Sequence, residues 1–580
     1  ERYGDKIPAY RAAYPDWWTD GFGSAARETA ASRKTHSDMT AVEGLLSMAV
    51  LKDKCLPQTT HQRIEHIHES LLFYDEHTFG ASESVSDPLC ENSQVQWGEK
   101  SAYAWEAVKR TQMLYETSVG LLQGDLRRGK NPTLTIFNTL NWKRSEMLTV
   151  YIDFEVIPRN QFFEITDFQG HSLKVQPIRY RREGCYYAIF AEDIPPMGYK
   201  TFEIVFKQPS TDTGTITINN ASIENHFYKL QLNPDKGTIQ SLYDKELNCE
   251  LVDSSSPWEL GAFIYEKLGN RDQLAQYRLD DYNRTGLSEC RIIDSSNGPI
   301  YQRILLQGKS PGTDEAFGVN LEIKLYHDTK RIELEYAIKR LPETDPSGIY
   351  VAFPFQLPEG KLAFDVQGGT VISGKNQLEG TSTDWNTVQN FVSVQNNQAQ
   401  IIIGSSLIPL YQLGDINLGK FQYQKQYERP HVYSWVMNNY WNTNFKASQE
   451  GEFRWSYHLT SSVDPSSNLA TKFGWSSRIP LYARVMPTGT ENHKPTEYSA
   501  FHFEKDNFLM TSCTPSKEEG YILLNIREID GKRTNLRILN EDGQTIPFTI
   551  VNAIEEKLEN ETSEHIFEGY QNKFIKIKRF

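Results

Sequence analysis

The sequence predicts a multidomain α+β protein in which a three-helix bundle is followed by antiparallel β-sandwich domains. Residues 1–127 carry apolar side chains at helical spacing, and the spacing changes to a period of two after Arg128. No alternation of strands and helices follows, which favours antiparallel sheets over a parallel sheet. With 580 residues, 38% of them hydrophobic, the chain is long enough for several packed domains.

Three helices are expected in the first 127 residues. The first spans 24–52, the second begins at Thr60 as its N-cap and stops at Gly80, and the third spans 94–123 before Gly124. Long helices with short connections predict an antiparallel bundle. The side chains expected to face inward on the second and third helices are Ile64, Ile67, Leu71, Leu72, Trp105, Val108, Tyr115, Val119 and Leu122.

Strand patterns fill the remainder of the chain, beginning with 133–137 and 147–152 on either side of a turn at 138–142. Polar stretches at 207–214 and near 462–466 indicate domain boundaries. We therefore expect four domains: a helical bundle at 1–127, a small β domain at 128–210, a large β-sandwich at 211–470 and a C-terminal β domain at 471–580.

Composition excludes several classes of partner. The net charge is −14 and there is no dense basic run, so we expect no nucleic-acid partner. No apolar stretch approaches the ~18 residues of a membrane span. The chain begins at Glu1 without a signal segment, and its first residues resemble the middle of a folded region. We therefore expect an N-terminal portion to be missing, and we leave the compartment, the cytoplasm or the periplasm, and a homo-oligomer open.

The segment at 74–80, Tyr-Asp-Glu-His-Thr-Phe-Gly, is the first candidate site. A histidine flanked by two carboxylates can be a metal ligand whose ring is oriented by a neighbouring acceptor. The alternative is an ordinary histidine at the end of a helix. No His-Glu-x-x-His run and no Cys-x-x-Cys pair is present, so His77 fits one ligand of a site completed elsewhere better than a complete zinc site.

Two further segments have the composition of a carbohydrate site. Residues 433–445 hold five aromatic residues among four asparagines. Aromatic rings stack on the C–H faces of sugars, and amides bond to hydroxyls as donors or acceptors. The alternative is an aromatic loop that packs between domains, with asparagines in turn conformations. Residues 15–21 place two tryptophans between two aspartates, which suits either a pocket wall or a helix cap with buried indoles.

Together these segments resemble the family 38 glycoside hydrolases, the retaining zinc-dependent α-mannosidases, in their bacterial form. The similar segments occur in one order over essentially the whole chain. Residues 15–21 with 24–30 resemble the start of the family's helical bundle, and 75–80 resemble the segment with its last zinc ligand. The segments at 137–142, 194–199, 350–355 and 438–445 resemble the start of its β region, two sandwich strands and a late motif.

The resemblance implies a role for each candidate residue. In the family, a histidine and two aspartates from an N-terminal α/β domain bind zinc together with one histidine from the bundle. By resemblance, His77 is that bundle ligand, and Asp75 or Glu76 orients its ring. Thr78 stands where animal members have an aspartate that contacts the sugar. The implied substrate-binding residues are Thr78, Asn438, Asn439, Tyr440, Trp441 and Asn444.

The resemblance also implies what the chain does not supply. No segment matches the family's His-x-Asp zinc motif, its nucleophile or its acid/base, so we expect no catalytic residue here and no activity from this chain alone. The whole protein would hydrolyse terminal α-mannosyl residues of oligosaccharides through zinc-assisted sugar binding and a glycosyl-enzyme intermediate. Residues 211–470 would form a mutarotase-like sandwich. The alternative is a carbohydrate-binding or scaffold β-sandwich module without catalysis.

Overall fold

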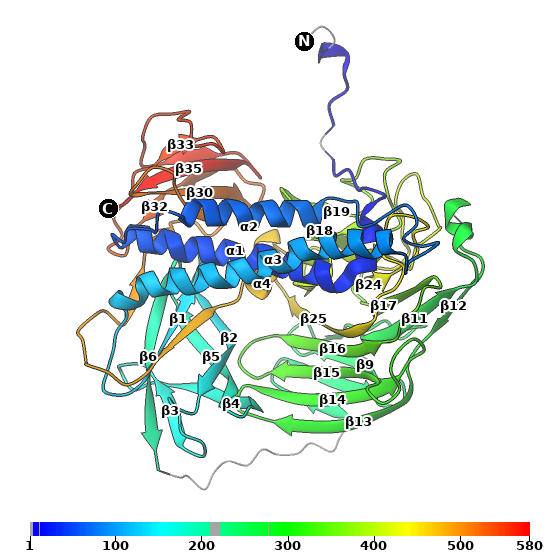
Figure 1. The fold of residues 1–580 in the computed structure, drawn as a ribbon, viewed down its shortest axis with the longest axis horizontal. Coiled ribbons are helices and arrows are strands. Elements are labelled where there is room, and N and C mark those ends of the chain that lie inside the picture. Colours follow the sequence, from blue (N-terminus) through cyan, green and yellow to red (C-terminus); the bar gives the residue numbers. More distant parts are fainter. Residues whose placement is uncertain (1–3, 11, 209–220, 277) are drawn as a thin grey trace.

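Three long helices run side by side in the computed structural model, which describes residues 4–10, 12–208, 221–276 and 278–580 (Figure 1). They are α1 (Ala26–Leu51), α2 (Thr60–Asp75) and α3 (Glu91–Leu122). Short 3-10 helices also occur in this part of the chain: η1 (Gly4–Lys6), η2 (Thr19–Ala25) and η3 (Gln123–Asp125). Helix α3 packs against both α1 and α2, and Val42, Ile67 and Leu114 meet in their shared core. The expected boundary at 207–214 lies mostly outside the described residues.

Two inward-facing predictions for these helices are wrong. Leu72 is 70% exposed and Trp105 is 43% exposed. Leu71 already fills the core position of that turn, and the next residue is rotated by about 100°, which turns Leu72 to solvent. Thr60 is the first helical residue rather than the cap, and Thr59 before it makes no side-chain capping bond.

An antiparallel sheet follows the helices and is completed by residues from much later in the chain. Strand β1 lies between β6 and β26, and it does not pair with β2, its neighbour in sequence. The order is β2-β5-β4-β3-β6-β1-β26, with β27 also on β6. The bounds are β1 (Thr133–Asn138), β2 (Arg144–Asp153), β3 (Phe162–Thr166), β4 (Ser172–Tyr180), β5 (Gly184–Ile194), β6 (Gly198–Lys207), β26 (Tyr482–Met486) and β27 (Glu497–Ser499).

The largest core lies among three further antiparallel sheets, which share one cluster of buried apolar side chains. The first is β10-β9-β8-β7: β7 (Ser222–Glu224), β8 (Tyr228–Asn233), β9 (Thr238–Asp244) and β10 (Cys249–Glu250). The second is β12-β11-β17-β24-β23-β20: β11 (Ala262–Leu268), β12 (Tyr282–Thr285), β17 (Ser347–Phe353), β20 (Asn386–Thr387), β23 (Leu410–Leu413) and β24 (Val432–Asn438).

The third sheet of this core has nine strands in the order β13-β14-β15-β16-β25-β22-β21-β18-β19. Its strands are β13 (Ser288–Asn297), β14 (Tyr301–Lys309), β15 (Val319–Tyr326), β16 (Ile332–Arg340), β18 (Lys361–Val366), β19 (Gly369–Ile372), β21 (Val392–Gln395), β22 (Gln400–Gly404) and β25 (Gly451–Ser462). A short 3-10 helix, η4 (Arg271–Gln276), follows β11. The antiparallel pairing agrees with the period-two sequence pattern.

The C-terminal part packs its sheet against α1 (Figure 1). Helix α4 (Ser467–Arg478) precedes β26, and Ser466 caps it by accepting a bond from the backbone N–H of Leu469. The sheet has the order β29-β30-β35-β33, and two strand pairs accompany it. The bounds are β28 (His502–Phe503), β29 (Phe508–Pro515), β30 (Tyr521–Glu528), β31 (Thr534–Leu536), β32 (Ile538–Leu539), β33 (Thr549–Val551), β34 (His565–Phe567) and β35 (Asn572–Lys578). Within the described residues, no helix has the length and apolarity to cross a membrane.

Candidate functional site

Three segments that are distant in sequence converge on one aromatic cluster. The ring of Phe79, just after α2, lies 5.1 Å from the ring of Phe22 in η2 and 5.5 Å from the ring of Phe445 after β24. Gly21 permits this approach, because a Cβ at that position would lie 2.2 Å from the Phe445 ring. The three segments singled out in the sequence, 15–21, 74–80 and 433–445, therefore form one region.

Polar contacts fix η2 against the end of β24. Asn438 Nδ2 donates to the backbone oxygen of Asp20 at 3.0 Å, and Gln449 Nε2 donates to that of Gly23 at 2.8 Å. A Cβ on Gly23 would lie 2.3 Å from Asn438 Nδ2, so this position also requires glycine. These buried bonds hold the Trp17–Trp18 pair at one end of the large sandwich.

Helix α2 ends at Asp75, five residues before the predicted stop at Gly80. The Lys100 ammonium of α3 donates to the backbone oxygens of Phe73 at 2.8 Å and Glu76 at 2.6 Å, which satisfies carbonyls at the helix end. The Glu76 carboxylate accepts bonds from the backbone N–H and the hydroxyl of Thr78, at 3.0 and 2.9 Å. These local bonds replace the next helical turn.

His77 lies on the surface beside this helix end. Its side chain is 59% exposed, and Nδ1 lies 2.9 Å from Glu76 Oε1. Burial acts to raise the pKa of Glu76, but the bonds from Thr78 prevail and the pKa is lowered. The ring of His77 meets the ring of Trp18 edge-on at 5.6 Å. Asp75, the other flanking carboxylate, instead bonds to Ser32 and His36 on α1.

The geometry at His77 fits a single metal ligand. With Nδ1 facing Glu76, Nε2 is the nitrogen that remains for a metal, in the manner of carboxylate-oriented histidine ligands. In the part of the chain that the structure describes, no group of three or more histidine, cysteine, aspartate or glutamate side chains is arranged to hold a metal ion. The other ligands of a zinc site at His77 would have to come from outside these residues.

The asparagine-rich segment divides into internal and accessible side chains. Asn438, Asn439 and Tyr440 are buried: Asn439 bonds to four backbone groups, and the Tyr440 hydroxyl donates to Glu266 at 2.6 Å. Asn444 has a left-handed φ of 39°, which asparagine tolerates. Of the implied substrate-binding residues, Trp441 is the one that lines the adjacent cavity with an incompletely buried ring.

This cavity, of about 330 Å³, opens beside Trp18. Its aromatic walls are Trp17, Trp18, Trp385 and Trp441, and its charged residues are Asp20, Arg271 and Asp384. The rings of Trp18 and Trp441 stack at 4.9 Å, and Trp385 meets Trp17 edge-on at 5.6 Å. We call it the tryptophan cavity.

The two carboxyl groups of the tryptophan cavity are buried. Trp441 Nε1 donates to Asp20 Oδ1 at 2.8 Å, yet burial raises the pKa of Asp20 to about 7. Asp384 Oδ2 accepts from the backbone N–H of Gly419 at 3.0 Å, and burial raises the pKa of Asp384 to about 6. Asp384 is 2% exposed, and its Oδ1 has no hydrogen-bond partner among the described residues. Sequence reasoning missed Asp384, Arg271 and Trp385, because no local motif marks them.

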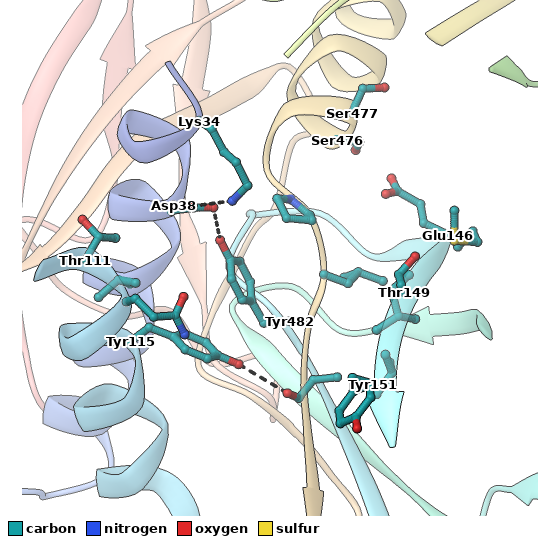
Figure 2. Close-up of a pocket in the computed structure, with 18 of the residues that line it drawn as sticks. Lys34, Asp38, Thr111, Tyr115, Glu146, Thr149, Tyr151, Ser476, Ser477 and Tyr482 are labelled. Carbon is teal, nitrogen blue, oxygen red and sulfur yellow. Dashed lines mark hydrogen bonds and ion pairs between the residues drawn. The ribbon is translucent and has the colours of Figure 1, made fainter. Parts of the chain in front are cut away.

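A second, larger cavity of about 980 Å³ lies between the helices, the first sheet and the large sandwich (Figure 2). Lys34 and Asp38 on α1 pair at 2.5 Å, and the Tyr482 hydroxyl donates to Asp38 at 2.8 Å. The other charged residues on its walls are paired as well: Glu116 with Arg484, Glu146 with Arg144, and His458 with Arg331 and Glu333. We call it the interdomain cavity.

Two family models match the chain, in the order that the sequence resemblance implies. The model of the α-mannosidase middle domain matches residues 16–122, and the model of the glycosyl hydrolases family 38 C-terminal domain matches residues 223–421. Together they span just over half of the chain. No curated protein matched the sequence.

Two solved structures share the fold over nearly the whole chain. One is an α-mannosidase from Enterococcus faecalis V583, with 13% identity and a TM-score of 0.73, covering 98% of this chain and 69% of that one. The other is a protein in glycosyl hydrolase family 38 from Enterococcus faecalis, with 14% identity and a TM-score of 0.72, covering 96% of this chain and 71% of that one. The alignments reach from the helices through to the C-terminal sheet.

Proposed function

We propose that this chain, which belongs to glycoside hydrolase family 38, is the C-terminal portion of a retaining α-mannosidase acting on terminal α-mannosyl residues of oligosaccharides or glycans. One observation carries the proposal: His77 meets Trp18 edge-on, and Trp18 stacks on Trp441, with both tryptophans lining the tryptophan cavity. An imidazole beside a partly exposed indole provides a metal ligand and an aromatic surface for a sugar in one place.

We assign the bundle's zinc ligand to His77, with the three long helices as the family's three-helix bundle. Glu76 would hold Nδ1 and leave Nε2 for the metal, whose role when bound is to coordinate sugar hydroxyls. Trp18 offers an indole face to the apolar side of the sugar ring next to that position. We place the nucleophile and the acid/base in an N-terminal domain of the same protein, since no segment of this sequence matches theirs.

The test replaces His77 in the full-length protein. We expect His77→Ala to lower zinc affinity at least tenfold and to abolish hydrolysis of an aryl α-mannoside. Zinc content of the unmodified protein should fall as the pH is lowered, because protein ligands bind metal in their deprotonated forms. His66→Ala, an exposed histidine of α2, is the matched control and should retain both properties.

Three results would redirect the proposal. Zinc content that is unchanged in His77→Ala, measured by mass spectrometry of the metal, removes His77 from the ligand set. Mannoside binding without hydrolysis by the full-length protein favours the alternative, a carbohydrate-binding module, for which the tryptophan walls of the cavity are the supporting observation. Turnover by the purified 580-residue chain contradicts the placement of the catalytic residues elsewhere.

A further inference from the structure

We propose that Arg271 is a positioning residue: its guanidinium holds the turn that carries Trp441, and so fixes where the Trp441 ring stacks on Trp18 beside His77. The use of these rings for a mannosyl unit rests on the proposed function. The hold on the turn rests on the hydrogen bonds of Arg271 alone.

The turn that follows β24 depends on partners from other segments. Residues 439–450, between β24 and β25, form neither helix nor strand, so their backbone carbonyls need donors from elsewhere. Arg271 Nη1 donates to the backbone oxygen of Asn439 and, at 2.7 Å, to that of Trp441. Its Nη2 donates to the backbone oxygen of Thr344, in the loop before β17, at 2.6 Å. One guanidinium therefore joins two loops that are distant in sequence.

The chemistry of arginine suits this task. A guanidinium has five N–H donors in a fixed planar fork, so a single side chain can reach several carbonyls at once. Hydrogen bonds from a charged donor are also stronger than those between neutral groups. Burial lowers the pKa of Arg271, and the charges of Asp345 and Asp272 act to raise it. The nearby carboxylates thus support the charge that the carbonyls bind.

The segment that carries Arg271 is held by internal bonds. Gln273 Nε2 donates to the backbone oxygens of Asn270 and Asp281, at 2.7 and 2.9 Å. Its Oε1 accepts from the backbone N–H of Asp281 at 3.0 Å. Gly269 packs closely here, because a Cβ at that position would lie 2.0 Å from the Asp281 carboxylate. Helix η4 therefore presents Arg271 from a cross-linked loop, as a clamp on another loop requires.

The Trp441 turn is coupled to His77 through one further ring. Trp441 Nε1 donates to Asp20 Oδ1 at 2.8 Å, so the indole is held at its edge while Arg271 holds the backbone. The Trp441 ring stacks on Trp18 at 4.9 Å, and Trp18 meets His77 edge-on at 5.6 Å. A gap of about 0.5–1 Å already forfeits about a quarter to a half of a dispersion contact, so a loosened turn would weaken this stack.

The first experiment observes the Trp441 ring in the 580-residue chain. The near-ultraviolet circular dichroism of the unmodified chain, minus that of Trp441→Phe, isolates the signal of the ordered Trp441 ring on Trp18. Arg271→Ala should lose most of this signal, because the turn no longer has its donor. Arg278→Ala is the matched control and should keep it, since Arg278 belongs to the same loop but is exposed and pairs with Asp280.

A second variant guards against misfolding of Arg271→Ala. Arg271→Gln keeps part of the stem and one NH₂ group, but it is neutral and cannot span three carbonyls. It should lose the Trp441 signal while the chain still unfolds cooperatively. A full Trp441 signal in whichever of the two variants folds would overturn the proposal.

The second experiment separates positioning from direct contact with the sugar, in the full-length protein. Arg271→Ala should raise KM for an aryl α-mannoside about three- to tenfold with little change in kcat, because an aromatic wall contacts the bound sugar and the transition state alike. In a Trp441→Ala background the same change should have less than about a twofold effect, since Arg271 acts through Trp441. An undiminished effect in that background overturns positioning in favour of direct contact.

The two proposals can fail independently. Hydrolysis that depends on His77 but has the same KM in Arg271→Ala and Arg278→Ala overturns the role of Arg271 and leaves the proposed function intact. A full-length protein without mannoside hydrolysis overturns the proposed function, whereas the circular dichroism of the 580-residue chain still decides whether Arg271 holds Trp441.

Discussion

The tryptophan cavity and the interdomain cavity differ most in how their charged groups are satisfied. The interdomain cavity is about three times larger, but its charged side chains pair with one another, as Lys34 does with Asp38. In the tryptophan cavity, Asp20, Asp384 and Arg271 form no ion pair within the part of the chain that the structure describes. The difference teaches that cavity volume is a poor guide to function here, since a cavity between domains can be large while its charged side chains already pair with one another.

The pKa shifts in the two cavities also have opposite consequences. Burial raises the pKa of Asp20 and Asp384, which favours their neutral form. In the interdomain cavity, burial lowers the pKa of His458 to about 3, and it is chiefly the nearby Lys324 charge that overcomes burial to hold the pKa of Glu333 at about 2. Acid therefore stabilises the tryptophan cavity and destabilises the interdomain cavity.

The largest expected effect comes from breaking the aromatic cluster around Phe79. Phe79 is 1% exposed and joins the three converging segments, so Phe79→Ala should lower the free energy of unfolding by about 3–5 kcal/mol. Phe73→Ala is the control, because Phe73 is 52% exposed and stacks only on Tyr103 among described aromatic rings; we expect about 1 kcal/mol or less. Denaturant unfolding measures both, and equal losses would show that the cluster at Phe79 is not a packing centre.

Asp20→Asn tests whether acid stabilises the tryptophan cavity. In the folded chain Asp20 keeps its proton to about pH 7, whereas its ordinary pKa is 3.8, so the stability from this proton is complete below about pH 4 and is lost as pH rises to 7. The variant lacks this loss, while its amide oxygen can still accept from Trp441. The free energy of unfolding of Asp20→Asn, minus that of the unmodified chain, should be about 3 kcal/mol greater at pH 8 than at pH 4.5.

Unfolding of both proteins at the two pH values measures this difference. Asp16→Asn changes an exposed aspartate of the same segment and should produce a much smaller one. A difference for Asp20→Asn that does not depend on pH would mean that Asp20 is ionised throughout this range.

His458→Gln tests the opposite sign in the interdomain cavity, with a somewhat smaller effect. His458 faces Arg331, Glu333 and Lys324, and burial keeps its ring neutral down to about pH 3, whereas the free ring has a pKa of 6.5. The stability that the neutral His458 ring contributes to the folded chain is present above pH 6.5 and is lost as the pH falls toward 3. Relative to that of the unmodified chain, the free energy of unfolding of His458→Gln should therefore rise by about 2.7 kcal/mol as the pH is lowered from 8 to 4.5. A shift of the same sign as that of Asp20→Asn would refute the contrast.

The sequence predicts the order of structural classes and the three segments of the site, because these depend on local patterns. Helical spacing gives way to strand spacing near Arg128, and the first strand begins at Thr133. The aromatic composition of 15–21 and 433–445 marks residues that do line a cavity, Trp18 and Trp441. The prediction of wholly inward-facing Leu72 and Trp105 failed because periodicity does not show which face of a helix remains uncovered.

The rest of the site depends on contacts across hundreds of residues. Asp384 meets Asp20 and the tryptophans only because the sandwich brings the segment before β20 beside η2. Composition also misleads in the other direction: Asn438 and Asn439 have the amides expected of a sugar site, but they bond to backbone groups of neighbouring segments. An amide that can bind a hydroxyl can equally satisfy a buried carbonyl, and only the fold decides between them.

The pairing of β1 with β26 sets a timing problem for synthesis. Residues 133–138 emerge from the ribosome roughly 350 residues before their partners at 482–486, an interval of roughly 20–70 s at ordinary elongation rates. Strand β6 is made much sooner after β1 than β26 is, so it can cover one side of β1 early, but the other side stays an open strand edge until β26 is made. An open edge pairs readily with other strands, so β1 is exposed to wrong pairing until residues 482–486 have been made.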